Sequence, residues 1–479
     1  MSFVSGEFAL FLLGSLVIYG LAPKRWRWGI LLAASYIFYG IWNWQYLWVL
    51  ALITLSSFAI ARKMAAEPEP RRKRFWLVFE LVLVLGLLIF FKFYDYLILA
   101  FENYSHLNSP LPILGIAAPL GIAFSSLQVT AYLVDVSRGQ MEPETHLGHY
   151  ALFVAFFPQQ VAGPITRAQK LLPQIKYLMP VLPEELQAGF HRLLLGAFQK
   201  FVIADRLANF TLPIFEDYKS YSSAVLLLNL YMYALQIYSD FAGYSNIAIG
   251  IAKLFGVNLA ENFKQPYLAL DVADFWNRWH ISLSNWLRDY IFYPVMRFLR
   301  TRSKNNRAWW LVWLPPLATM LVSGLWHGAG PKFIVWGLLH GVMLAVSAAT
   351  ARWRKQMAER MGKAGWVFKL AQWVVTFHFL VFSWAFFTLD GVITALRYLR
   401  LIASGVSSGT ALSPQIIWGT LVIFGLYLIS ELLVYFEVFT KRLDQSPLWV
   451  RWAVYYIFIF VVMFMGNFAG SKPFIYEFF

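Results

Sequence analysis

WWLVWLPPLATMLVSGLWHGAGPKFIVWGLLHGVMLAVSAAT, residues 309–350, holds two apolar runs joined by the short segment HGAGP (327–331). The first run, 309–326, would rise about 27 Å as a helix, nearly the thickness of a bilayer's hydrocarbon core. Pro331 fits the first turn of a following helix, where its missing N–H costs nothing. The stretch therefore predicts two membrane helices that meet at a glycine-rich break.

Apolar runs of this kind recur along the whole chain. Of its 479 residues, 59% are hydrophobic and 14% are charged, whereas a soluble protein carries about 25% charged residues. The runs are continuous, unlike the short alternating segments of a β-barrel. We predict an all-α, polytopic membrane protein with about eleven to thirteen membrane helices, some of them re-entrant. The expected spans are 8–22, 28–45, 46–61, 75–100, 113–134, 148–163, 186–212, 222–240, 309–326, 332–350, 366–388, 414–436 and 448–467.

The net charge of +15 is concentrated between the apolar runs, which is the pattern of cytoplasmic loops and not of a nucleic-acid surface. With these loops in the cytoplasm, the N-terminus lies outside and His327 lies deep in the membrane or towards its outer half. We interpret the apolar stretch at the N-terminus as a first membrane helix and not as a cleaved signal. The basic clusters are KRWR (24–27), RRKR (71–74), RFLRTRSKNNR (297–307) and RWRK (352–355).

The chain has no cysteine, which excludes disulfides, thiol catalysis and cysteine-ligated metal. His280, His327 and His340 lack metal-ligand spacing and HExxH is absent, so no metal is expected. Nucleotide-binding and serine-nucleophile signatures are also absent. The polar interruptions are too short to fold alone, so we expect a single membrane domain over residues 1–479.

Residues 274–290 combine polar and aromatic side chains too densely for a helix that faces lipid. Asp274 is a candidate N-cap, and tryptophans recur along one helical face. One interpretation is an amphipathic helix at the membrane surface; the other is the wall of a cavity. The candidate wall residues here are Asn277, Ser282, Asn285, Arg288 and Asp289, together with His280.

The break SGLWHGAG (323–330) places His327 beside three glycines. A histidine at a break is commonly a hydrogen-bonded structural residue. Here the glycines Gly324 and Gly328, with Gly330, allow close helix approach or positive φ and leave room for a substrate. An imidazole buried in apolar surroundings is held neutral, which is the form that a general base requires. His340 has the default interpretation of a packing or hydrogen-bonding residue. Trp326 and Ser323 are candidate substrate contacts.

Three further motifs, FPQQVAGPITR (157–167), GAFQKFVIADRL (196–207) and YSDFAGYSNIAIG (238–250), complete the candidate site. Pro158, Gly163 and Pro164 break helices, so backbone groups there must be satisfied by protein or line a cavity. Asp240, at the expected end of an apolar helix, is either a helix-terminal residue or a cavity residue that pairs with Arg or His.

Together with ENFKQPY (261–267), FWNRWHISLSNWLRDYIFYP (275–294), SGLWHG and the terminal FIYEFF (474–479), these motifs resemble the membrane-bound O-acyltransferase family, and most closely its bacterial branch that O-acetylates exopolysaccharides such as alginate. The motif-bearing core runs over about 119–341, with peripheral helices in 1–118 and 342–479. Glu477 departs from the FIYFQF ending frequent in that branch.

The resemblance implies a helical fold that encloses a tunnel or funnel, with His327 matching the family's essential histidine and His280 a second polar position facing the same tunnel. It implies a cytoplasmic acyl donor, acetyl-CoA, and no bound cofactor. The acceptor is an extracytoplasmic polysaccharide, reached directly or through a periplasmic SGNH-type acetyltransferase partner, and the location is the bacterial inner membrane.

We therefore expect an O-acyltransferase in which His327 is a general base or a transient acyl carrier, and in which His280, with Asn277, Arg288 and Asp289 nearby, orients the substrate or polarises the thioester carbonyl. Three alternatives within this chemistry are transfer to peptidoglycan, to cellulose, or of D-alanyl groups to teichoic acid. A proton-coupled transporter is an alternative of another class, which the lack of an internal repeat disfavours. A scaffold subunit is disfavoured because both histidines are present.

Overall fold

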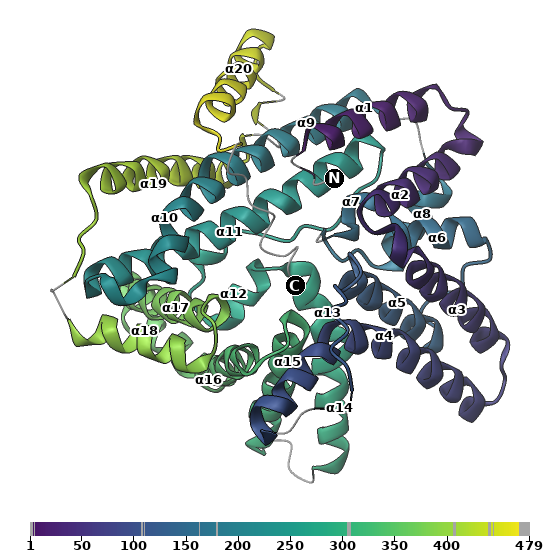
Figure 1. Cartoon of the computed structure of the whole chain (residues 1–479), viewed down its shortest axis with the longest axis horizontal. Coiled ribbons are helices and arrows are strands. Elements are labelled where there is room, and N and C mark those ends of the chain that lie inside the picture. Colours follow the sequence, from purple (N-terminus) through teal and green to yellow (C-terminus); the bar gives the residue numbers. More distant parts are fainter. Residues whose placement is uncertain are drawn as a thin grey trace. The chain divides into compact units, whose positions relative to one another are not determined.

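The computed structural model describes residues 3, 5–106, 109, 111–161, 163–178, 181–303, 308–405, 409–438, 442–443 and 445–468. Within these ranges the secondary structure is helical and contains no strand (Figure 1). The predicted all-α class is confirmed. The terminal FIYEFF segment with Glu477 lies outside the described residues.

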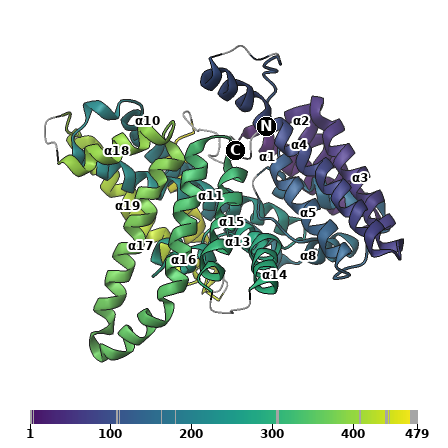
Figure 2. The same ribbon diagram turned by 90° about the horizontal axis from the view of Figure 1, so that it is seen from below.

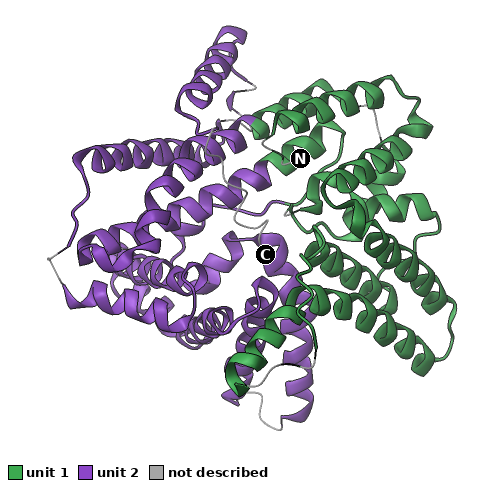
Figure 3. Cartoon of the chain, in the orientation of Figure 1, with its two compact units in different colours: residues 1–193, 247–260 green, residues 194–246, 261–479 purple. Residues whose placement is uncertain are grey.

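The chain divides into two compact units (Figure 3). Unit 1 comprises residues 1–193 and 247–260, and unit 2 comprises residues 194–246 and 261–479. Two long helices, α9 and α11, contribute residues to both units. The single membrane domain expected from the sequence stays a prediction.

Unit 1 is built from helices whose ends follow its glycines and prolines. The span expected at 113–134 starts later, at Ile122, because Gly121 adopts a left-handed backbone (φ 70°) immediately before it. The span expected at 148–163 is interrupted at Phe156, and Pro158 lies in the first turn of the next helix. The helices are α1 (Gly6–Leu21), α2 (Arg27–Asn43), α3 (Leu47–Ala66), α4 (Pro70–Ser105), α5 (Ile122–Ser137), α6 (Leu147–Ala155), α7 (Phe157–Gln160), α8 (Ala168–Lys176) and α9 (Pro183–Ala197).

Unit 2 holds the remaining helices, and two of its fully described segments are π-helical. π-Helices are rare and frequently occur at functional sites; here they are Phe198–Ala204, after α9, and Arg288–Phe292, after α13. The helices are α10 (Asp205–Glu216), α11 (Ser223–Leu254), α12 (Val272–Arg278), α13 (Ile281–Leu287), α14 (Tyr293–Arg302), α15 (Trp310–His327), α16 (Pro331–Arg360), α17 (Gly365–Thr388), α18 (Val392–Ser404), α19 (Pro414–Tyr435) and α20 (Leu448–Met465).

Six helical segments among the described residues are long and apolar enough to cross a membrane: Lys24–Ala66, Pro70–Ser105, Pro331–Arg360, Gly362–Thr388, Pro414–Tyr435 and Leu448–Met465. The first contains both α2 and α3. Other expected spans form helices that are shorter, such as α1 and α5, or more polar. The chain is a multi-pass membrane protein.

Helices α15 and α16 form an antiparallel pair that packs side by side (Figures 1 and 2). A Cβ atom built on Gly324 would lie 2.2 Å from the carbonyl oxygen of Phe333, and one on Gly337 would lie 2.3 Å from the carbonyl oxygen of Met320. Small residues let membrane helices approach at backbone distance. The glycines therefore fix the spacing of the two helices, as expected for Gly324.

We expect Gly324→Ala to destabilise the protein by about 1–3 kcal/mol, because the added methyl group overlaps a backbone atom that cannot rotate away. The measurement is the apparent melting temperature in detergent. The control is Gly86→Ala on α4, where a Cβ meets nothing within 4 Å. A melting temperature for Gly324→Ala equal to that of the control would contradict the packing argument.

Candidate functional site

The ring of His327 lies at the C-terminal end of α15, enclosed by aromatic rings. Its centroid is 4.9 Å from that of Trp326, 5.1 Å from that of Trp336 and 5.3 Å from that of Phe387. The residue is 1% exposed. A base in such a site is shielded from bulk water, which strengthens its electrostatic interactions with a reacting group.

The sequence predicts open space for a substrate beside Gly328, but in the structure this space is filled. A Cβ on Gly328 would lie 2.1 Å from the ring of Phe333, so a side chain of this protein occupies the room that the sequence assigned to a substrate. Gly330 has a positive φ of 144°, as the break requires.

His340 holds Trp336 against His327. Its Nδ1 accepts a hydrogen bond from the indole N–H of Trp276 (3.3 Å), which leaves Nε2 to carry the proton and donate to Ser383 Oγ (3.1 Å). Ser383 in turn donates to the carbonyl of Leu380. The imidazole ring of His340 lies 4.8 Å from the ring of Trp336. His340 is thus a hydrogen-bonded packing residue, as its default interpretation predicts.

His280 lies at a break between α12 and α13 and has a left-handed backbone (φ 42°, ψ 52°). Its ring is fully buried, with its centroid 4.7 Å from Phe241 and 6.1 Å from Trp326. The indole of Trp326 therefore neighbours both histidines. A left-handed conformation is uncommon outside glycine, and such strain concentrates at functional sites.

Asn262 fixes this strained turn, a role that the sequence analysis missed. Its carbonyl accepts from the N–H of Ile281 (2.9 Å), its Oδ1 accepts from Ser282 Oγ (2.6 Å), and its Nδ2 donates to Ser245 Oγ (3.1 Å). The only signal was its place in ENFKQPY, because a loop residue that caps a distant helix leaves no periodic pattern.

The break at His280 corrects the prediction of one continuous helix over 274–290. Trp279 has an extended backbone, so the faces counted across it are not continuous. The predicted N-cap is also wrong: Asp271, and not Asp274, caps α12, because its side chain accepts from the N–H of Asp274.

A cavity of about 610 Å3 lies in unit 2, between α12–α14 and the α15–α16 pair. This volume is in the range of small-molecule sites. Its polar lining residues are Asn277, Ser284, Arg288 and Thr319, and Arg288 donates a hydrogen bond to Asn277 Oδ1 (2.7 Å). Asn277 is exposed and Thr319 is buried, so the cavity runs inwards from the surface.

One face of α15 leads from this cavity to His327. Thr319, Ser323 and His327 are four residues apart, so their side chains follow one another along the same face, about 6 Å per step. Thr319 lines the cavity, and Ser323 and His327 are buried beyond it.

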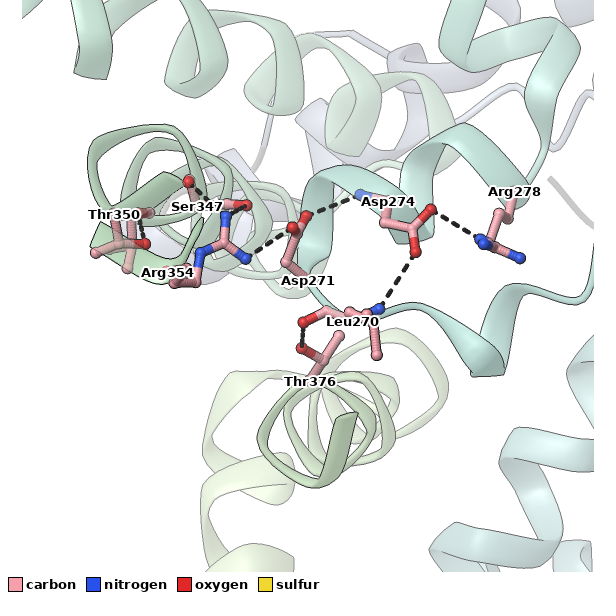
Figure 4. Close-up of polar contacts among 9 residues, drawn as sticks. Leu270, Asp271, Asp274, Arg278, Ser347, Thr350, Arg354 and Thr376 are labelled. Carbon is pink, nitrogen blue, oxygen red and sulfur yellow. Dashed lines mark hydrogen bonds and ion pairs between the residues drawn. The ribbon is translucent and has the colours of Figure 1, made fainter. Parts of the chain in front are cut away.

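A polar network ties the cavity wall together (Figure 4). Arg354 of α16 donates to Asp271 Oδ2 (2.7 Å) and to the carbonyl of Ser347 (2.8 Å), while Asp274 pairs with Arg278 (2.8 Å). Burial alone would raise the pKa of Asp271, but the N–H of Asp274 and the Arg354 guanidinium outweigh burial and hold this pKa below its ordinary value. The network joins α12, which carries Trp276 and Asn277, to α16.

Asp240 lies in the middle of α11 and not at a helix end, which corrects the prediction. Its Oδ1 is 2.8 Å from Lys200 Nζ, which is also 2.9 Å from Asp205 Oδ1. All three residues are buried, and Asp240 pairs with a lysine, a partner that the sequence analysis did not name. Buried charges persist when they are paired, so the cluster has a structural explanation.

The other predicted site residues are distributed as follows. Asp289 is exposed and Asn285 is half-buried; neither lines the cavity. Pro158, Gly163 and Pro164 belong to unit 1, where a Cβ on Gly163 would lie 2.3 Å from the Cα of Gln159. The catalytic roles assigned to His327 and His280 stay predictions.

Comparison with known proteins gives consistent matches. The profile of MBOAT, the membrane-bound O-acyltransferase family, matches residues 140–389. A peptidoglycan O-acetyltransferase of Helicobacter pylori is 34% identical over 411 residues, covering 79% of this chain and 73% of that protein. A probable alginate O-acetylase of Pseudomonas aeruginosa is 33% identical, covering 84% of this chain and 75% of that protein. A teichoic acid D-alanyltransferase of Bacillus subtilis is 29% identical, covering 56% of this chain and 68% of that protein.

The left-handed backbone of His280 predicts that a glycine at this position gives a more stable protein than an alanine. His280→Gly and His280→Ala both remove the imidazole, but only glycine adopts this conformation without steric cost. We expect the glycine variant to be more stable by about 1 kcal/mol, measured by thermal unfolding in detergent. A more stable alanine variant would show that the turn is not strained.

The lowered pKa of Asp271 predicts a pH-dependent contribution to stability. A carboxylate whose folded pKa is depressed stabilises the protein above its ordinary pKa, and loses this effect as pH falls through the folded pKa. We expect Asp271→Asn, which still caps α12, to lower the free energy of unfolding by about 2 kcal/mol near pH 7. The two proteins should be equally stable once the wild-type carboxyl is protonated.

The measurement is the melting temperature of wild type and Asp271→Asn from about pH 7 down to pH 3. Lys355→Gln is the control, because the Lys355–Glu359 pair is exposed and 4.0 Å apart. A difference for Asp271→Asn that does not change with pH would contradict the role of the carboxylate charge.

Proposed function

The chain belongs to the membrane-bound O-acyltransferase family and is a multi-pass membrane O-acyltransferase, and we propose that it moves acetyl groups from cytoplasmic acetyl-CoA to an extracytoplasmic polysaccharide. The proposed location is the bacterial inner membrane. The observation that carries the proposal is the single face of α15 on which a surface-connected cavity, at Thr319, leads to a buried histidine, His327.

The basic segments support a donor that enters from the cytoplasm. Met296 of α14 and Ala348 of α16 line the cavity. Arg297 follows the first directly, and Arg352 follows the second after one helical turn. Arginine-rich segments next to membrane helices favour the cytoplasmic side. The cavity then forms the cytoplasmic half of the path that the acyl donor follows. His327, at the other end of α15, lies in the outer half of that path.

In the proposed reaction His327 acts as the general base. It takes the proton of the acceptor hydroxyl as that oxygen bonds to the thioester carbonyl carbon. The C–S bond then breaks, and His327 returns the proton to the thiolate that leaves. His280, whose ring also neighbours that of Trp326, orients the substrates. Arg288 at the exposed part of the cavity supplies positive charge for the phosphates of the donor.

A polysaccharide acceptor is favoured by two relatives that each match at least 79% of this chain and are named for acetylation of peptidoglycan and of alginate. The second candidate is D-alanyl transfer, favoured by the teichoic acid D-alanyltransferase match. We propose that acetyl reaches the polymer directly or through a periplasmic SGNH-type acetyltransferase.

The test is acyl transfer by the purified protein from labelled acetyl-CoA to oligosaccharides of alginate and of peptidoglycan, with a D-alanyl thioester as the competing donor. We expect His327→Ala to lower turnover by about 10²–10⁴-fold, the contribution of a well-placed acid–base group, and to remain folded. His378→Ala is the control, because His378 lies on α17 and its Nδ1 is within 2.7 Å of the Val374 carbonyl oxygen.

Wild-type turnover in His327→Ala would contradict the proposal. Label that stays covalently attached to the protein after denaturation, and is absent from His327→Ala, would make His327 an acyl carrier instead of a base. Use of the D-alanyl donor in preference to acetyl-CoA would select the second candidate function.

A further inference from the structure

Two buried polar groups beside His327 lack hydrogen-bond partners among the described residues: the hydroxyl of Ser323 and the indole N–H of Trp336. Ser323 is 0% exposed and Trp336 is 1% exposed. Buried donors are nearly always paired in folded proteins, so each exception calls for an explanation.

Several polar groups around Trp336 are satisfied by protein partners, although the indole N–H of Trp384, whose ring lies 6.2 Å from that of Trp336, also lacks one among the described residues. Both ring nitrogens of His340, the indole N–H of Trp276 and the hydroxyl of Ser383 all take part in hydrogen bonds. Among the donors without partners, Ser323 shares the helical face of His327, and the ring of Trp336 is in direct contact with the His327 ring.

Both groups have a fixed position relative to His327. Ser323 precedes His327 by four residues on α15, on the same helical face and between the histidine and cavity-lining Thr319. The ring of Trp336 lies 5.1 Å from that of His327 at an angle of 88°, and the neighbouring His340 ring (4.8 Å) holds it in place.

We propose that the Ser323 hydroxyl and the Trp336 indole N–H donate hydrogen bonds to the carbonyl oxygen of the acyl thioester and form the oxyanion hole of this enzyme. The inference rests on the proposed function, in which the thioester lies along the Thr319–Ser323–His327 face.

The two donors act at the step where charge develops. When the acceptor oxygen bonds to the carbonyl carbon and its proton moves to His327, the C=O electron pair shifts onto the carbonyl oxygen. The two donors stabilise that oxyanion until the C=O bond re-forms, the C–S bond breaks and the thiolate takes the proton from His327. Preorganised donors in a site without water are effective because they need no reorientation during the reaction.

The informative variants are Trp336→Phe, which keeps an aromatic ring but removes the N–H, and Ser323→Ala. Loss of one oxyanion donor typically lowers kcat by about 10²–10³-fold. We expect each variant to lose kcat by this factor with little change in KM for acetyl-CoA, because the hydrogen bonds strengthen in the transition state.

Two matched controls separate this role from packing. Trp384→Phe alters an equally buried indole that lies one ring further away, against Trp336 and Phe387. Ser239→Ala removes a buried hydroxyl on α11 that also lacks a partner among the described residues. Both controls should keep kcat within a few-fold of wild type.

A second measurement remains informative if a variant loses stability. A trifluoromethyl ketone analogue of acetyl-CoA mimics the oxyanion, whereas a thioether analogue has no carbonyl oxygen. We expect Trp336→Phe and Ser323→Ala to weaken binding of the ketone by the same factor as kcat/KM, and to leave binding of the thioether unchanged.

Unchanged ketone affinity in both variants, or full kcat in both, would overturn the inference even if wild type transfers acetyl. Equal loss of ketone and thioether binding would also overturn it, because the residues would then only shape the pocket. A wild-type protein that does not transfer acetyl from acetyl-CoA would overturn the proposed function, and this inference with it.

Discussion

Gly324 and Gly337 let the backbones of α15 and α16 approach until a methyl group no longer fits between them. This contact determines where the side chains of the candidate site lie. It brings Trp336 of α16 against His327 of α15. It also aligns the cavity-lining residues of α15 with those of α16. A larger residue at either glycine would push the helices apart and separate the histidine from its aromatic enclosure.

Burial in an apolar environment imposes a second requirement, that polar groups be paired. His340, Asn262 and the Lys200–Asp240–Asp205 cluster all meet it with protein partners. Groups of this kind stabilise and orient the helices. The exceptions at Ser323 and Trp336 occur where the proposed substrate carbonyl would supply the missing acceptor.

Much of the fold was predictable from the sequence because long apolar runs have few alternatives in a membrane. Both ends of α15, the start of α16 and the break at HGAGP follow from composition and from Pro331, whereas α16 continues to Arg360, beyond its expected end at residue 350. The split at His280 was not predictable, because a non-glycine residue in a left-handed turn has no sequence signature and depends on the distant Asn262. The Lys200–Asp240 pair was not predictable, because it joins two helical segments 40 residues apart in the sequence and leaves no local pattern.

The central claim is that the acyl donor occupies the cavity that leads to His327. The chain has no cysteine, so Thr319→Cys introduces a single thiol into the cavity wall, and Val322→Cys introduces one on the exposed face of the same helix. The measurement is the rate at which each thiol reacts with a methanethiosulfonate reagent, with and without acetyl-CoA. We predict that acetyl-CoA protects the thiol at position 319 and not the one at position 322. Equal reaction rates at position 319 with and without acetyl-CoA would contradict it.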